Sequence, residues 1–340
     1  MSGELYCGVD LHSNNGVYDI MADDGKCVWH RRLENRPETV LPALSEFREQ
    51  LVCIAIESTY NWYWLADCLE DAGYSVTLAN PSAMDQYSGL KNTNDDSDAR
   101  FIADLLRLGI LPKGWICPRQ DRALRDLLRR RMMFVNARTR LVLSLQSMVV
   151  RQTGRRLSLK SLEVLETEAL ARLLEHEALL AVAHWELDLV HGHDVAIRSL
   201  EEFALGQCTP RPEHRLLRTV PGIGQILAMV IMLEIGDIRR FPSPGDLSSY
   251  ARSVEAKRTS NGKSKGKNNG RNGNKYLSWA FIEAANHAIR CCGPARKWYQ
   301  RKAAKTLPVV GRKALSSKWS KAVWYMLTEQ KCFELGRVFG

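Results

Sequence analysis

The sequence predicts an α/β domain at the N-terminal end, followed by two largely helical regions. In residues 4–118, short apolar runs bounded by polar residues alternate with helical stretches. Residues 119–205 contain no convincing strand and almost no glycine or proline, which is typical of long helices. Residues 206–340 hold apolar helical stretches around one very basic segment. A chain of 340 residues has room for two or three such domains, and we expect boundaries near 118 and 205.

The first domain is expected to follow the order strand, strand, strand, helix, strand, helix, strand, helix. Asp23-Asp24-Gly25 is a good hairpin turn between the second and third strands, and Pro37 suits the first turn of the first helix. The expected strands are 4–10, 17–22, 27–32, 51–57 and 74–79, and the expected helices are 37–50, 61–72 and 95–108. Periodicity by itself supports only an α/β assignment here.

The middle region is expected to form long helices of opposite charge. Residues 119–152 have the apolar spacing of one helix, and 158–205 that of one or two more. Residues 119–160 carry 12 basic and 2 acidic side chains, whereas 161–205 carry 2 basic and 10 acidic ones. This pattern favours antiparallel pairing, or a coiled coil that joins two copies of the chain. A solvated helical hairpin that links two domains is the alternative.

The third region contains a tight turn, Pro221-Gly222-Ile223-Gly224, before the apolar helix 225–235. A helix, this turn and a second helix resemble a helix-hairpin-helix element. Such a turn offers the backbone N–H groups around Gly222 and Gly224 to a DNA phosphate. A plain turn between two helices is the alternative.

The stretch from Lys257 to Lys275 contains seven basic residues and no acid. Its basic residues are Lys257, Arg258, Lys263, Lys265, Lys267, Arg271 and Lys275. One interpretation is a disordered linker that binds nucleic acid through phosphate attraction alone. The other is a flexible loop that presents a serine, Ser260 or Ser264, to a phosphodiester in a positive field that favours the serine alkoxide.

Charge is distributed unevenly along the chain. The formal net charge is +10, yet residues 1–118 carry 9 Lys+Arg against 18 Asp+Glu, a net of −9. Residues 206–340 carry 25 against 8, a net of +17. This split predicts a nucleic-acid-binding part joined to a part rich in metal-binding carboxylates.

Cysteine spacing and hydropathy predict an intracellular location. The nine cysteines include no Cys-x-x-Cys pair and no zinc-like spacing, which fits reduced thiols in a cytosol. No signal peptide is expected, and no apolar run reaches the roughly 20 residues of a membrane span. We therefore expect a cytoplasmic protein without a membrane partner.

Four acids in the first hundred residues have a spacing that suggests a metal site. Asp10 and Glu57 each close an apolar strand, whereas Asp95 and Asp98 open a helix, where a spacing of three puts both on one face. Carboxylates at strand ends and at a helix start can converge on hard cations such as Mg2+. Two such ions can act on a phosphodiester in an in-line displacement. Taken singly, each acid fits a surface or capping role, and Asp95 suits the N-cap of its helix.

Together these features resemble the DEDD-type transposases of the insertion-sequence 110 family, and within it the insertion-sequence 1111 group. The resemblance covers essentially the whole chain, and its C-terminal part is the more specific. The matching motifs are GVD at 8–10, AIEST-Y at 55–60, DxSDARFIA at 95–103, PGIG at 221–224, LSSYARSVEAKRTSNG at 247–262 and NGNKYLSWAFIEAANHA at 272–288.

The resemblance implies a RuvC-like, ribonuclease H-like fold for residues 1–118. In it, the acids that bind divalent metal are Asp10, Glu57, Asp95 and Asp98, with Mg2+ as the metal and Mn2+ as a substitute. A helical region, 119–205, would follow, and its apolar stripe and charge pattern lead us to expect that it serves dimerisation. The C-terminal transposase domain, 206–340, would contain Ser260 as the nucleophile that attacks DNA and stays joined to it as a phosphoserine.

The resemblance also implies the partners. Members of the family excise and insert their element with a structured guide RNA, encoded in the element, that pairs with target and donor DNA. The basic C-terminal surface would then hold nucleic-acid backbones while base pairing selects the sequence. The expected partners are double-stranded DNA, the guide RNA and further copies of the chain, as a dimer and as a tetramer at synapsis. The expected location is the bacterial cytoplasm, at the nucleoid during reaction.

Three residues depart from the family pattern. Asp96 adds a fifth acid, so that Asp95 and Asp96 could exchange roles as metal ligands. Asn261 follows the serine where many relatives have glycine, and Arg252 replaces a common glycine.

Two other functions fit the residues. One is a metal-only nuclease or junction resolvase of the RuvC or ribonuclease H type, in which water attacks and Ser260 merely contacts a phosphate. The other is a non-catalytic protein that binds RNA or DNA on a decayed nuclease scaffold. The intact set of four acids argues against decay.

Overall fold

The computed structural model describes residues 3–90, 97–158, 161, 167–174, 176–207, 211–254, 257–260, 263–267 and 272–339. For 257–260 and 263–267 it describes the backbone and not the side chains. The chain divides into two compact units, Met1–Cys117 and Pro118–Gly340.

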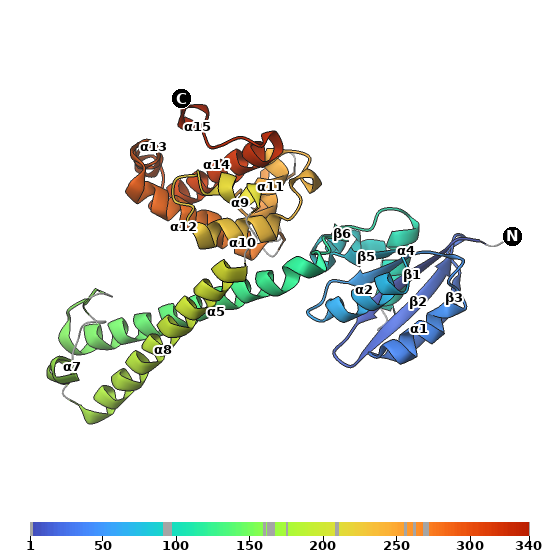
Figure 1. The fold of residues 1–340 in the computed structure, drawn as a ribbon, viewed down its shortest axis with the longest axis horizontal. Helices are drawn as coiled ribbons and strands as arrows, with labels where there is room; N and C mark the ends of the chain where they lie inside the picture. Colours follow the sequence, from blue (N-terminus) through green and yellow to red (C-terminus); the bar gives the residue numbers. More distant parts are fainter. Residues whose placement is uncertain are drawn as a thin grey trace. The chain divides into compact units, whose positions relative to one another are not determined.

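The first unit is built on a mixed sheet of six strands (Figure 1). In chain order the strands are β1 (Leu5–Leu11), β2 (Asn15–Ala22), β3 (Cys27–Glu34), β4 (Leu51–Glu57), β5 (Val76–Ala79) and β6 (Lys113–Gly114). Their order across the sheet is β3-β2-β1-β4-β5-β6. β1 is antiparallel to β2 and parallel to β4, and β4 is parallel to β5. The carboxyl ends of β1 and β4 therefore meet at the same edge of the sheet.

Helices cover both faces of this sheet. They are α1 (Pro37–Ser45), α2 (Trp62–Asp71), α3 (Pro81–Met84) and α4 (Ser97–Arg107), with a 3-10 turn at Asp85–Leu90. On one face, Cys7 and Val9 of β1 pack with apolar residues of α1 and α2. On the other face, Ala55 of β4 packs with Phe101 and Leu105 of α4. Successive residues of a strand point to opposite faces, so one strand contributes to both apolar layers.

The predicted combination of an α/β part with a mostly helical remainder is confirmed. Strand β4 coincides with the expected strand 51–57. The other expected elements of the first unit are present with ends that differ by one to a few residues, and α1 stops at Ser45 rather than continuing to 50. Neither α3 nor β6 is predicted by the sequence pattern.

The second unit begins with a long helical hairpin. Helix α5 (Arg119–Thr153) ends at Gly154, whose φ of 67° is the left-handed conformation that closes many helices. Helix α8 (Glu177–Gln207) lies beside α5 in Figure 1, and the short α7 (Thr167–Leu173) precedes it. In the described part of the chain, no helix is both long enough and apolar enough to cross a membrane.

Ion pairs join the two long helices within the chain. Arg131 and Arg138 of α5 pair with Glu201 and Asp194 of α8, respectively. The basic segment and the acidic segment therefore neutralise each other at least in part inside one molecule.

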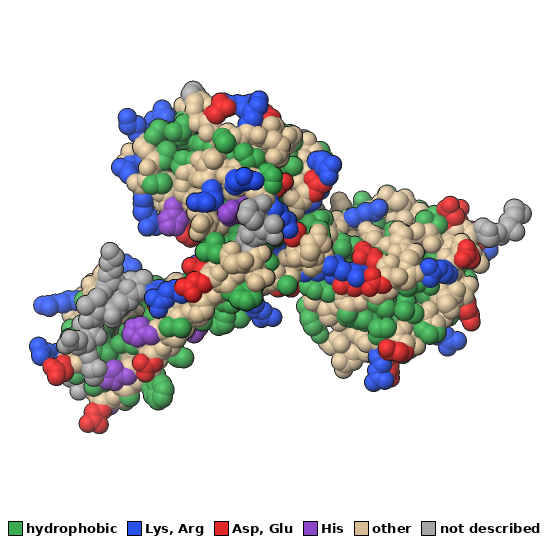
Figure 2. Space-filling model, viewed as in Figure 1, with side chains coloured by type: hydrophobic (Ala, Val, Ile, Leu, Met, Phe, Trp, Pro, Cys, Tyr) green, Lys and Arg blue, Asp and Glu red, His purple; other side chains and the backbone are tan. Residues whose placement is uncertain are grey.

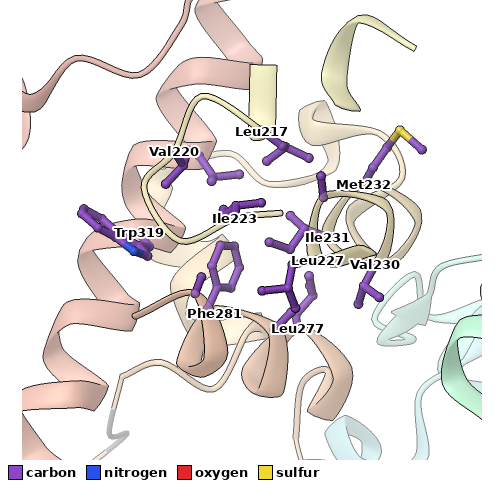
Figure 3. Close-up of a cluster of buried hydrophobic side chains, with 14 of the residues drawn as sticks. Leu217, Val220, Ile223, Leu227, Val230, Ile231, Met232, Leu277, Phe281 and Trp319 are labelled. Atoms are coloured by element: carbon purple, nitrogen blue, oxygen red, sulfur yellow. The ribbon is translucent and has the colours of Figure 1, made fainter. Parts of the chain in front are cut away.

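The rest of the second unit is a helical core. Its helices are α9 (Pro212–Leu217), α10 (Gln225–Ile235), α11 (Pro244–Tyr250), α12 (Lys275–Cys291), α13 (Gly293–Ala304), α14 (Pro308–Glu329) and α15 (Leu335–Phe339), with a 3-10 turn at Ile238–Arg240. Figure 3 shows Leu277 and Phe281 of α12 pointing toward Leu227 and Ile231 of α10, with Trp319 of α14 to the left of Phe281. Almost the whole of α10 is buried, so this helix is the centre of the core.

The basic segment contains a second, two-stranded sheet. β7 (Lys257–Ser260) pairs antiparallel with β8 (Lys263–Lys267). The expectation of a disordered linker or a flexible loop is wrong for the backbone of these residues. The sequence does hold a signal for a hairpin, because Asn-Gly at 261–262 is a favourable two-residue turn between antiparallel strands.

Candidate functional site

Asp10 and Glu57 lie on neighbouring strands at one edge of the six-stranded sheet. Gly8 of β1 is paired with Ala55 of β4 in a parallel register. Asp10 and Glu57 come two residues further along each strand, and residues two apart share a face of a sheet. Both carboxylates therefore lie on the face that carries Ala55, which is the face that α4 covers.

Gly8 accounts for how closely α4 approaches this edge. A Cβ added at Gly8 would lie 2.1 Å from the carbonyl oxygen of Ala99 and 2.4 Å from the backbone nitrogen of Ala103. A residue without a side chain is needed to leave room for the helix there. Asp98 precedes Ala99 in the first turn of α4. It is thus carried on the same face of the sheet as the two acids at the strand ends.

The other two expected metal ligands are Asp95 and Asp98. Asp98 is described and half-buried, whereas Asp95 and its neighbour Asp96 lie outside the described residues. Within the described ranges, no three His, Cys, Asp or Glu side chains form a group able to hold a metal ion. Asp10 and Glu57 share one edge of the sheet, and Asp98 belongs to the helix that covers the same face, but their side chains do not meet as one group. Carboxylate oxygens of this kind are the donors that suit a hard divalent cation.

Asp10 is held in a well-packed environment. Its side chain is buried, and its Oδ2 lies 3.4 Å from Nε2 of His12. The side-chain amides of Asn35 and Asn61 both donate to the carbonyl of His12, at 2.9 and 2.8 Å. The turn after β1 is therefore tied to two other segments, which limits how far Asp10 can move.

A second buried carboxylate in this unit, Asp19 of β2, is not among the predicted site residues. It is 1% exposed, and its Oδ2 lies 3.0 Å from Nδ1 of His30 and 3.8 Å from Nε of Arg100. Arg100 belongs to α4, so this cluster fastens the helix of Asp98 to the sheet. The signal in the sequence is a charged residue inside the apolar run 17–22.

Cysteines of this unit are poor candidates for a nucleophile. Burial raises the pKa of the thiols of Cys7, Cys27 and Cys53, and the charge of Asp19 raises that of Cys7 and Cys27 further. Because the thiolate is the reactive form, a raised pKa disfavours these thiols as nucleophiles near neutral pH.

In the second unit, Ser260 is the last residue of β7 and is paired with Lys263 of β8. The register also sets Lys257 opposite Lys267 and Thr259 opposite Ser264. The expected basic residues on these strands are Lys257, Arg258, Lys263, Lys265 and Lys267, whereas Arg271 lies outside the described residues. The register therefore places basic residues on both strands of the hairpin that contains the serine. Lys and Arg side chains also lie around the helical core on the face drawn in Figure 2.

The Pro-Gly-x-Gly turn joins α9 to α10. Gly222 has a φ of 89°, and a Cβ there would lie 2.2 Å from the carbonyl oxygen of Ala284 in α12. Close packing on α12 thus accounts for glycine at 222. Gly224 is exposed, precedes the first residue of α10 and has open space around its Cα. At the start of α12, Nζ of Lys275 lies 5.1 Å from the centre of the Tyr276 ring.

Models of two transposase domains match the chain. Residues 7–153 match a transposase domain of the DEDD type, and residues 214–300 match the domain described as transposase IS116/IS110/IS902 family. The first match includes β1, β4 and α4 with their acids, and the second includes α10, the basic hairpin and α12.

Curated relatives agree with these domains. A protein of Pseudomonas aeruginosa named as a family 20 transposase is 24% identical over 303 residues, which cover 85% of this chain and 88% of that protein. The transposase for insertion sequence element IS1111A of Coxiella burnetii is 22% identical over 346 residues, covering 97% of this chain and 91% of the relative. Both domain matches and both relatives lead to one conclusion: the chain contains the DEDD and IS116/IS110/IS902 domains of insertion-sequence transposases and is a homologue of the IS1111A transposase.

Proposed function

We propose that this transposase cuts and rejoins DNA with a divalent metal held by four acids and with Ser260 as the nucleophile. The observation that carries the proposal is the register of β1 and β4, which sets Asp10 beside Glu57 under the helix of Asp98. The proposed organisation is a RuvC-like nuclease domain at 1–118, a helical region at 119–205 and a transposase domain with the serine at 206–340.

The acids supply the metal-binding part of the mechanism. Asp10, Glu57, Asp95 and Asp98 would hold Mg2+, or Mn2+ in its place, through carboxylate oxygens. A divalent cation bound there neutralises charge that develops on the non-bridging oxygens of a scissile phosphate. The contacts of Asp19 with Arg100 and His30 support this role, because they keep α4 against the sheet.

Ser260 supplies the covalent part of the mechanism. Its Oγ would attack phosphorus, losing the hydroxyl proton, while the bond from phosphorus to a deoxyribose oxygen breaks and that oxygen takes up a proton. The product is a phosphoserine-linked DNA end, whose bond energy is conserved for rejoining to another strand. The positive hairpin supports the step because it stabilises the serine alkoxide and attracts the DNA backbone.

Partners of the reaction follow from charge and from the need to exchange strands. The +17 charge of residues 206–340 suits double-stranded DNA and an element-encoded guide RNA, which would select target and donor by base pairing. Strand exchange needs two active sites, so a dimer, and a tetramer at synapsis, would act. The acids and Ser260 belong to different units, and a composite site assembled from two subunits is consistent with this.

Substitution of the acids tests the metal-binding part of the proposal. Asp10→Ala, Glu57→Ala and Asp98→Ala should each lower Mg2+-dependent strand cleavage by about a hundredfold or more, because each removes charge stabilisation at the reacting phosphate. Nucleic-acid binding should be retained, since the basic residues are untouched. Asp95→Ala should behave likewise and Asp96→Ala should be milder.

Cleavage by the Asp10→Ala protein at the wild-type rate in Mg2+ would refute the metal site. A stronger effect of Asp96→Ala than of Asp95→Ala would show that the two acids are exchanged. The measurement is the rate of strand cutting on a labelled duplex of the element's end, with the variants at equal concentration.

A further inference from the structure

The core of the second unit contains a buried carboxylate with no part in the proposed chemistry. Glu234 is the one charged residue in the sequence of α10, and it is 2% exposed. Transfer of a carboxylate into an apolar core is unfavourable unless the group is paired and hydrogen-bonded. Buried ion pairs of this kind often add little net stability, and what they do supply is a fixed geometry between the segments that they join.

Two side chains from distant segments satisfy Glu234. Arg129 of α5 donates from Nε to Oε1 at 2.6 Å and from Nη2 to Oε2 at 2.7 Å, a bidentate pair. Asn274 donates from Nδ2 to Oε2 at 2.8 Å. The guanidinium of Arg129 also lies 4.5 Å from the centre of the Tyr276 ring in α12.

Asn274 joins this buried pair to the start of α12. Its Oδ1 accepts hydrogen bonds from the backbone nitrogens of Tyr276 and Leu277, at 2.8 and 3.0 Å, as an N-cap. The amide thus has one end on Glu234 and the other on the first turn of the helix. Both the position and the orientation of residue 274 are therefore fixed.

The chain just before the basic hairpin is tied to the same place. The backbone nitrogen of Asn274 donates to the carbonyl of Tyr250 at 2.6 Å. Arg252 donates from Nε to the carbonyl of Asn272 and from Nη2 to the carbonyl of Gly273, both at 2.9 Å. The residues that enter and leave the segment 255–271 are consequently held against each other beside Glu234.

We propose that Glu234, Arg129 and Asn274 form a clamp that positions the serine hairpin on helix α5. These are positioning residues: they act on Ser260 through the base of the hairpin and do not touch DNA. The role of the clamp in catalysis rests on the proposed function of Ser260, whereas its role in holding β7 and β8 does not. Arg129 belongs to α5, so the clamp would hold the base of the hairpin at a fixed position on this helix.

The test changes the two partners of the hydrogen bond from Asn274 to Glu234. Asn274→Asp keeps an oxygen that can cap α12 but replaces the donor to Glu234 with a second carboxylate. Asn274→Ser also keeps a capping oxygen and is too short to reach Glu234. The double variant Glu234→Gln/Asn274→Asp restores this hydrogen bond with donor and acceptor reversed, and Arg129 keeps one of its two acceptors, the side-chain oxygen of residue 234 that faces Nε. Glu201→Gln is the matched control, since it breaks another ion pair of α5, that of Arg131, far in sequence from the hairpin base.

Amide hydrogen exchange in the full chain is the first measurement. Asn274→Asp and Asn274→Ser should speed exchange in 257–260 and 263–267 by about tenfold or more, with α10 and α12 unchanged, as for local opening. The double variant should recover most of the protection, and Glu201→Gln should match the wild type. Wild-type exchange in the hairpin of Asn274→Asp would overturn the clamp. Equal loosening of α10, α12 and the hairpin without rescue would do the same, because it would show a purely structural role.

Formation of the serine–DNA adduct is the second measurement. Asn274→Asp should lower its rate by about a hundredfold, as expected for a nucleophile displaced by about 1 Å, with DNA affinity retained. The double variant should regain most of the rate. If the wild-type chain forms no adduct, the proposed nucleophile fails, and the exchange experiment still decides whether the clamp exists.

Discussion

Gly8 shows how one residue without a side chain can position a candidate metal site. The backbone of α4 lies where the Cβ of any other residue would be, with Ala99 and Ala103 as the obstacles. The packing explains the glycine of the motif at 8–10 as the contact that lets the helix of Asp98 approach, and the proposed metal site gives a role to the aspartate.

Gly8→Ala should therefore destabilise the protein. The added methyl group meets backbone atoms that cannot move away cheaply, and overpacking of this kind costs about 1–3 kcal/mol. Thermal unfolding of the first unit should shift to lower temperature, and Mg2+-dependent cleavage should fall because α4 moves off the sheet. Gly192→Ala in α8 is the matched control. A Cβ there meets nothing within 4 Å, and the change should stabilise by about 0.5–1 kcal/mol. Unchanged stability of Gly8→Ala would contradict the packing argument.

Arg252 is a non-glycine residue with a left-handed backbone conformation. The family resemblance leads one to expect glycine at this position, and the φ of 52° at Arg252 lies in the left-handed region that glycine favours. The unfavourable backbone conformation of Arg252 is offset by its two hydrogen bonds to the carbonyls of Asn272 and Gly273. The sequence alone cannot reveal these hydrogen bonds, because Asn272 lies 20 residues after Arg252, on the other side of the hairpin.

At the scale of secondary structure, periodicity predicts the elements that have a distinct apolar face. Strand β4 and helix α5 have long, regular patterns, and their predicted ranges agree closely with the structure. Strand β6 has two residues, too few for any period to be visible. The hairpin of β7 and β8 has no apolar alternation, so a charge-rich composition conceals it, and the Asn-Gly pair is its one local signal.

The candidate site is predicted only in part, because a local sequence pattern identifies some of its residues and not others. Two acids at strand ends can be found from short apolar runs, because parallel neighbours end at the same edge. Asp19, Glu234 and Asn274 cannot, because each depends on partners brought together by tertiary packing. Their signal is a polar residue in or beside an otherwise apolar stretch, which does not identify the partner.

The pairing of α5 with α8 is open to a charge-exchange experiment. Arg138→Glu should place like charges beside Asp194 and destabilise the hairpin. The double variant Arg138→Glu/Asp194→Arg should recover stability, with a coupling free energy of about 0.5–3 kcal/mol for a half-buried contacting pair. Denaturant unfolding of the two single variants and the double variant measures the coupling. Strict additivity of the single effects would show that the two side chains do not interact in solution.

At the scale of the whole molecule, acidic and basic residues are concentrated in different parts of the chain. Residues 1–118 have a net charge of −9 and residues 206–340 a net charge of +17. Carboxylates gather where a cation would be held, and Lys and Arg gather where nucleic-acid backbones would lie. The proposed metal chemistry and the proposed nucleic-acid binding would therefore belong to different parts of one chain.

The basic region should make nucleic-acid binding depend strongly on salt. Each phosphate contact releases counterions, so affinity should fall by about 10³–10⁵ between 50 and 200 mM salt if about 6–10 contacts form. Protein expressed together with its native flanking DNA should copurify with a discrete RNA encoded by the element. Recombination at unchanged sites after complete removal of RNA would rule out selection by base pairing. Titrations over a salt series and sequencing of the bound RNA make the two measurements.

The most direct test of the central claim is to look for DNA covalently attached to Ser260. Wild-type protein incubated with Mg2+ and labelled DNA from the element's end should give an adduct that survives denaturation in detergent, with phosphoserine at position 260 by peptide mass analysis. Ser260→Ala should lose the adduct and recombination while it still binds DNA and RNA, since loss of one hydroxyl at a polar position changes stability little. Ser264→Ala, the serine of β8 that pairs with Thr259, should keep both activities. Cleavage of DNA by Ser260→Ala in Mg2+ at the wild-type rate would contradict the account and would identify water as the nucleophile.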